Sequence, residues 1–88
     1  MYFLIKYSRT IEARGIFGSD IVTYYYILEK AASKEEAIDN ATEHLLKTFS
    51  NIHIERINEI TKEYAKFYLK LGKTQVRSLE LRREIMSK

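Results

Sequence analysis

The sequence contains no cysteine, no proline and no tryptophan, and only three of its 88 residues are glycine. Without cysteine there is no disulfide, no thiolate metal site and no cysteine nucleophile. The longest apolar runs have five residues, too few for a membrane-spanning helix or a signal peptide, so we expect a cytoplasmic protein that does not bind membranes. The two histidines, His44 and His53, are too few for a histidine-based metal site, and we expect no metal or other cofactor.

What the chain does contain is typical of a folded protein. Hydrophobic residues make up 45% and charged residues 31% of the sequence, which is a globular balance rather than a disordered one. A chain of this length fills one core, so residues 1–88 are expected to form a single domain. Because that core is small, a homodimer through the second helix or through the tyrosine-rich sheet would add buried apolar surface.

Two strands are expected in the first third of the chain. Residues 2–13 alternate, with Phe3, Ile5 and Tyr7 on one face and polar side chains mostly on the other, as in a half-buried strand. Residues 21–29 are rich in β-branched and aromatic types and are apolar on both faces, which predicts a central strand antiparallel to the first. The segment 14–20 has two glycines and ends in Ser-Asp, which favours a hairpin loop.

A helix and a third strand are expected next. Ser33 and Glu36 have the spacing of a capping box, and an apolar stripe that includes Ala37, Ala41 and Leu45 follows, up to a stop near residue 50. Residues 52–60 fit either a strand or a helix. We favour a strand through about residue 59, because isoleucine is dense there and a two-stranded sheet would be marginal.

The clearest helical pattern begins at Thr61. The apolar residues at helical spacing, which we expect to lie in the core, are Ile60, Tyr64, Phe67, Tyr68 and Leu71. The pattern continues in more polar form toward the end of the chain, so we expect a long C-terminal helix, either continuous or broken at Gly72. The predicted fold class is α+β, with an antiparallel sheet of about three strands in the order β-β-α-β-α, packed under one helix.

Positive charge is concentrated in the second half of the chain. The net charge is +3, and residues 51–88 hold nine basic and five acidic residues. On a continuous helix, Lys62, Lys66, Lys70, Lys73 and Arg77 would fall within an arc of about 80° opposite the apolar stripe. That pattern fits a solvated outer face, and it also fits a surface that follows phosphates. The candidate nucleic-acid-binding residues are Lys66, Lys70, Lys73, Arg77, Arg82 and Arg83.

Seven tyrosines are a second notable feature, and three of them, Tyr24 to Tyr26, are consecutive. On a strand these three point to alternate faces, so some are exposed unless both faces are covered. We favour an ordinary surface role for the exposed tyrosines of a packed sheet; the functional alternatives are a stacking platform for bases and a protein interface. The G-x-x-G between Gly15 and Gly18 is interpreted as a turn.

No group of residues has the pattern of a catalytic site. His44 is expected on a helix and His53 on a strand, and neither lies near a nucleophile motif such as G-x-S-x-G. We therefore expect a protein that is not an enzyme and has no catalytic residues.

The composition resembles that of the small accessory proteins of large tailed bacteriophages. Lys, Ile, Asn, Tyr and Phe, which AT-rich codons encode, supply 34 of the 88 residues, in a short chain with a basic end. Proteins of this kind adapt, inhibit or shield the nucleic-acid machinery of the host. The resemblance implies an antagonist of a host system and assigns no role to any single residue.

The sequence favours a small basic protein that binds nucleic acid, RNA rather than DNA, without sequence specificity, because lysine contacts to phosphates carry no base information. The alternative is a protein-binding inhibitor or adaptor that uses an exposed tyrosine-rich surface on a host protein. The salt dependence of binding distinguishes the two functions, since only phosphate binding weakens steeply with salt.

Overall fold

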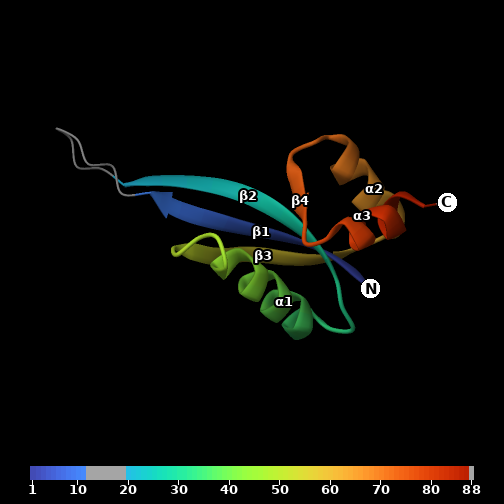
Figure 1. Ribbon diagram of the computed structural model, residues 1–88, viewed down its shortest axis with the longest axis horizontal. Coiled ribbons are helices and arrows are strands. Elements are labelled where there is room, and N and C mark those ends of the chain that lie inside the picture. The colour runs from blue at the N-terminus through green and yellow to red at the C-terminus, as the bar shows by residue number, and fades with distance from the viewer. Residues whose placement is uncertain (12–19, 88) are drawn as a thin grey trace.

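The computed structural model describes residues 1–11 and 20–87. Within them lie four strands and three helices (Figure 1): β1 (Tyr2–Ile11), β2 (Ile21–Lys30), α1 (Lys34–Leu46), β3 (Ile52–Ile60), α2 (Lys62–Lys70), β4 (Thr74–Val76) and α3 (Leu79–Met86). The α+β class is confirmed, as are the first helix and the third strand. The G-x-x-G and the last two residues of the expected first strand lie outside the described residues.

The strands form one mixed sheet in the order β3-β1-β2-β4. β1 pairs antiparallel with β2 and with β3, whereas β4 pairs parallel with β2. The predicted sheet of three antiparallel strands is therefore incomplete. Its fourth strand has only three residues, and it pairs with a segment more than forty positions away, so local periodicity does not reveal it.

Helix α1 covers one face of the sheet. It begins at Ser33, whose hydroxyl accepts a hydrogen bond of 3.1 Å from the Glu36 amide, while the Glu36 carboxylate accepts one of 3.3 Å from the Ala32 amide. Its small residues Ala37 and Ala41 are fully buried and bring the helix close to the sheet. The first core lies between them and comprises Phe3, Ile5, Tyr7, Ile27, Ala31, Ala37, Ala41 and Leu45.

The prediction of a long continuous C-terminal helix is wrong, because the chain turns at Gly72. This glycine has a φ of +75°, the left-handed conformation that commonly ends a helix. Helix α2 stops at Lys70, β4 follows, and Ser78 caps α3 by accepting a hydrogen bond from the Leu81 amide. The break at Gly72 was one of the two alternatives that the sequence left open.

The prediction that the apolar stripe of the second helix lies in the core is wrong for three of its five residues, since only Ile60 and Tyr68 pack against the second core. Tyr64, Phe67 and Leu71 are 60%, 54% and 54% exposed, whereas Ala65 and Leu69 are buried. Ala65 lets α2 lie close to the sheet, and the helix buries the face that carries Ala65 and Leu69 instead of the face that carries Tyr64 and Phe67. The second core, on the opposite sheet face from α1, comprises Leu4, Leu28, Ala65, Leu69, Leu81 and Ile85.

Polar contacts attach the C-terminal elements to the sheet. The Glu84 carboxylate of α3 forms an ion pair with Lys30 and accepts a hydrogen bond from the Tyr2 hydroxyl at 3.3 Å. On the other face, the Tyr7 hydroxyl donates to the Gln75 side chain at 2.9 Å. These contacts attach α3 and β4 to one end of the sheet, where α2 also lies (Figure 1).

Candidate nucleic-acid interface

The six basic residues singled out in the sequence come from four different segments. Lys66 and Lys70 lie on α2, Lys73 follows the turn at Gly72, Arg77 follows β4, and Arg82 and Arg83 lie on α3. The single basic stripe that a continuous helix would have carried is therefore absent. Lys66 and Lys70 remain one helical turn apart on α2, where Lys66 is half-buried and Lys70 is exposed.

Only one of these six cations forms an ion pair within the described residues. The Nε atom of Arg77 lies 3.1 Å from the Oε2 atom of Glu29, a carboxylate that is completely buried. The contact lacks hydrogen-bond alignment, so both Glu29 oxygens have no hydrogen-bond donor among the residues described. Burial raises the pKa of Glu29 to about 7, although the nearby Arg77 charge opposes this shift.

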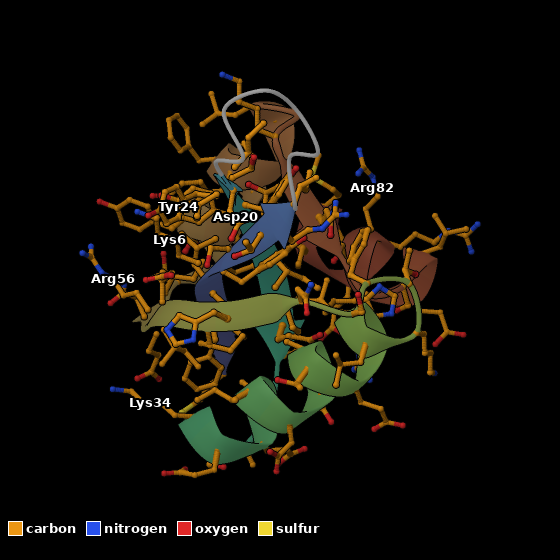
Figure 2. All side chains as sticks on the ribbon, turned by 90° about the vertical axis from the view of Figure 1, so that its left-hand side faces the viewer. Lys6, Asp20, Tyr24, Lys34, Arg56 and Arg82 are labelled. Atoms are coloured by element: carbon orange, nitrogen blue, oxygen red, sulfur yellow. The ribbon has the colours of Figure 1, made fainter. Side chains whose placement is uncertain are left out.

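Arg77 and Arg82 are the only two of the six that line a common cavity described here. That cavity lies along β4 and the start of α3 and has a volume of about 380 Å³. Figure 2 places Arg82 on the far side of the molecule from Lys6, Tyr24 and Arg56, so the basic residues form more than one surface.

The sheet face that α2 and α3 cover is only partly buried. These helices pack over Leu4 and Leu28, whereas the strands continue beyond them (Figure 1). Farther along the strands this face carries Lys6, Tyr24, His53 and Arg56, which we call the open face. It also carries Ser8, Thr10, Val22 and Tyr26. Tyr24, which lies beyond these two helices, is 55% exposed.

Strand register brings the open face together. Lys6 is directly opposite Arg56 of β3, and its neighbour on the same face, Ser8, is directly opposite Tyr24 on one side and His53 on the other. The ammonium of Lys6 lies 4.8 Å from the centroid of the Tyr24 ring. Lys6, Tyr24 and Arg56 project from the same side of the sheet in Figure 2.

A β-bulge shapes the β3 side of the open face. The register between β1 and β3 shifts between Lys6 and Tyr7, so Glu55 is the extra residue of β3. The Ser8 hydroxyl donates a hydrogen bond of 2.8 Å to the Glu55 carboxylate. Glu55 is exposed, as are Arg56 and His53, and its hydrogen bond to Ser8 brings a carboxylate to the edge of the open face.

Aromatic rings extend from the open face toward α2. Tyr26, which shares this face with Tyr24, stacks on Tyr68 with ring centroids 6.4 Å apart, and Tyr68 meets Phe67 edge to face at 5.8 Å. The largest cavity described, about 440 Å³, adjoins them and is lined by Leu4, Asn58, Glu59, Ile60, Thr61, Tyr64 and Tyr68. The cleft combines two tyrosine rings with the Asn58 amide, the Thr61 hydroxyl and the Glu59 carboxylate. Stacking on an aromatic ring and hydrogen bonds to an amide are contacts that an unpaired base makes.

The middle tyrosine of the consecutive three faces the opposite way. Tyr25 stacks on Tyr7 at 5.5 Å beside the first core, and the Arg9 guanidinium lies 3.6 Å from the Phe49 ring centroid on that same side. The alternation expected for Tyr24–Tyr26 is confirmed, and Arg9 is occupied in covering the α1 side of the sheet.

Sequence reasoning missed Lys6, His53 and Arg56 as a group. The alternation of the first strand already placed Lys6 opposite the core face. Arg56 and His53 lie in the segment whose strand or helix character was ambiguous, and the bulge at Glu55 shifts their register. No sequence pattern indicates which strand residues become neighbours across β1.

Comparisons with known proteins give no relative. No family model, no curated protein and no solved structure matches the chain. In the part of the chain that the structure describes, none of the helices combines the length and apolar character needed to cross a membrane.

Proposed function

We propose that this protein binds single-stranded nucleic acid, RNA first, through the open face. The observation that carries the proposal is the Lys6 ammonium 4.8 Å from the centroid of the exposed Tyr24 ring, with Arg56 directly across from Lys6 on β3. A positive charge beside an exposed aromatic ring is the combination that unpaired nucleotides require, since the ring stacks on a base while the cation contacts its phosphate.

Each open-face residue has a distinct task in this proposal. Tyr24 offers its exposed ring to one base, and Lys6 and Arg56 contact the flanking phosphates. The cleft at Tyr68 and Asn58 receives a neighbouring base. Base pairs in a duplex conceal the ring faces that stacking needs, so a single strand is preferred to a double strand.

The basic residues on α2 and α3 have a supporting role. Lys66, Lys70, Lys73, Arg82 and Arg83 form no ion pair within the described residues, and they give this end of the molecule a positive field. Such a field raises the rate of encounter with a polyanion and weakens with salt. We propose the cytoplasm as the compartment and no catalytic step as part of this function.

The test is binding of a single-stranded RNA of about ten nucleotides at about 50 mM salt. The double variant Lys6→Gln/Arg56→Gln is expected to reduce affinity tenfold or more, and Tyr24→Ala about tenfold, since stacking on one base contributes about 1–3 kcal/mol. Lys34→Gln, which removes one charge from the start of α1, is the matched control and should change affinity less than twofold.

Wild-type protein that fails to retain the RNA contradicts the proposal. Loss of binding in Lys66→Glu/Lys70→Glu/Lys73→Glu with full binding in the open-face double variant moves the interface to α2. Because all of these side chains are at least partly exposed, their replacement leaves both cores intact.

A protein-binding function is the second candidate, favoured by the outward-facing side chains of α2. Tyr64, Phe67 and Leu71 are each more than half exposed, and such a group is typical of a protein interface rather than of a solvated helix. An inhibitor or adaptor acting on host machinery would use this surface. Phe67→Ala should then abolish binding to the partner with little salt dependence, and should leave RNA binding within twofold.

A further inference from the structure

Arg77 lies between two polar cavities on the side of the molecule away from the open face. One cavity, about 270 Å³, separates it from α1 and is lined by Asn40, Glu43, His44 and Lys47. The other is the cavity of about 380 Å³ along β4, where Arg77 meets Ser78 and Arg82. We call these two cavities, with Arg77 shared between them, the Arg77 furrow.

Three cations line the Arg77 furrow: Lys47 from α1, Arg77 after β4, and Arg82 from α3. Glu43 is the one carboxylate that lines it, which leaves a net charge of +2 before the neighbouring Glu29 is counted. Asn40, His44 and Ser78 add side chains that donate hydrogen bonds. The cavity along β4 holds Arg77 and Arg82 without a carboxylate, and the cavity toward α1 holds Arg77 and Lys47 with Glu43. Two cations and a serine hydroxyl in the β4 cavity favour a dianion with several acceptor oxygens.

Arg77 forms an ion pair with the buried Glu29 carboxylate through one of its three guanidinium nitrogens. Its Nε atom lies 3.1 Å from the buried Glu29 carboxylate, yet its side chain remains 42% exposed. This contact involves the Nε atom, so the two Nη groups of Arg77 remain for a ligand. The surface lysines of α2 have no such ion pair among the described residues.

We propose that the Arg77 furrow binds a phosphate monoester in the cavity along β4, with the Nη groups of Arg77 as the central contact, Arg82 beside it and Lys47 in the adjoining cavity. This site shares no residue with the open face and does not rest on the proposed binding of RNA. The phosphate has two chemical sources, a free nucleotide and the terminal phosphate of an oligonucleotide, and both present the same dianionic group.

Glu29 makes this site sensitive to pH. The charged group that acts on Glu29 is Arg77, and its β1 register partner is the apolar Phe3. Glu43, His44 and Lys47 of α1 line the cavity that Arg77 borders. Because burial raises the pKa of Glu29 to about 7, this carboxyl is neutral in mild acid and negative at higher pH. Its ionisation lowers the net charge around the furrow from +2 to +1, so affinity for an anion of constant charge falls as the pH rises through about 7.

The first experiment titrates ¹⁵N-labelled protein with inorganic phosphate and follows the amide signals of residues 40–47 and 75–82. Binding with a Kd of about 1 mM or tighter is expected. Arg82→Gln should weaken binding at least threefold, whereas Lys34→Gln, at the other end of α1 from the furrow, should change it less than twofold. Absence of any shift in these signals, or equal losses in both variants, overturns the proposal.

Arg77→Gln alone leaves the Glu29 charge buried without its cation and is expected to destabilise the fold. The double variant Glu29→Gln/Arg77→Gln removes both charges and tests the central contact, with an expected loss of at least tenfold in phosphate affinity. A folded double variant that binds phosphate like the wild type contradicts the role given to Arg77.

Sulfate is the probe for the pH effect, because its charge is constant over this range. Wild-type affinity for sulfate should be several-fold lower at pH 8 than at pH 5.5, and the ratio should shrink in Glu29→Gln more than in His44→Gln. The opposite order assigns the pH effect to His44 and overturns the role of Glu29. A nucleotide that competes with phosphate identifies the free source, whereas competition only by an oligonucleotide with a terminal phosphate identifies the other.

Discussion

The Nε atom of Arg77 lies 3.1 Å from the buried carboxylate of Glu29, and this pair joins β2 to the segment that follows β4. The two residues are 48 positions apart and belong to the strand pairing that the sequence did not predict. A completely buried carboxylate without a hydrogen-bond donor is costly to ionise, and Arg77 offsets only part of that cost. The raised pKa of Glu29 therefore makes the stability of the domain depend on pH.

Stability should decrease as the pH rises from 5 to 8. The pKa of Glu29 is raised from its usual 4.5 to about 7 by burial, so the folded state binds a proton that the unfolded chain has released. The protonated Glu29 carboxyl therefore stabilises the folded state fully when the pH is below 4.5, the pKa of this group in the unfolded chain. This stabilisation is lost as the pH rises through about 7, its pKa in the folded state.

Urea unfolding at pH 5 and pH 8 measures this effect. From this group alone the wild type should lose about 2 kcal/mol of unfolding free energy between the two values. Glu29→Gln should lose less than the wild type over the same range. Identical pH dependence in the two proteins would show that Glu29 is ionised in the folded state.

The capping of α1 is testable with a single hydroxyl. Ser33→Ala removes the acceptor for the Glu36 amide, which is 3.1 Å from the Ser33 oxygen, and should lower the unfolding free energy by about 1 kcal/mol. Ser50→Ala, at an exposed serine outside any described helix, is the control and should be close to neutral. An equal effect in the two variants would mean that the cap does not stabilise α1.

The two sides of α2 should respond differently to truncation. Phe67→Ala is expected to change stability by about 0.5 kcal/mol or less, because the ring is 54% exposed. Leu69→Ala should cost about 2–5 kcal/mol, because it opens a cavity in the second core. Thermal unfolding of both variants is the measurement, and a reversed order would restore the orientation that the sequence pattern predicted for this helix.

Gly72 should be hard to replace although the space around it is free. A Cβ atom there would meet no heavy atom within 4 Å, so any cost comes from its φ of +75° alone. Gly72→Ala should lower the unfolding free energy by about 1 kcal/mol, and Gly72→Asn by less, because asparagine tolerates the left-handed region better. Chemical denaturation compares the two, and a stabilised alanine variant would mean that α2 continues past Lys70.

Local signals predicted part of this fold well. The Ser33–Glu36 capping box, the alternation of Phe3, Ile5 and Tyr7, and the apolar strand that contains Ile27 each depend on neighbours along the chain. The structure confirms all three. The sequence pattern predicted the wrong buried face for α2, because the pattern was read from the large apolar side chains. In the structure the helix packs closely against the sheet through the small residue Ala65.

The candidate site was less predictable for a related reason. The open face depends on strand register, on the bulge at Glu55 and on which part of the sheet α2 leaves uncovered. All three are consequences of tertiary packing. The charge count did show that the second half of the chain is basic, but it did not show that Lys6, near the start, lies opposite Arg56.

Binding of RNA by the open face is tested most directly by mapping the RNA contact onto single residues. ¹⁵N-labelled protein is titrated with a single-stranded RNA of about ten nucleotides, and the amide shifts are assigned. The largest amide shift changes are expected at Lys6, Tyr24 and Arg56. Weaker changes are expected on α2, and these should disappear first as the salt concentration is raised. Shifts confined to α2 and α3, or no shifts at all, would contradict the open face as the nucleic-acid interface.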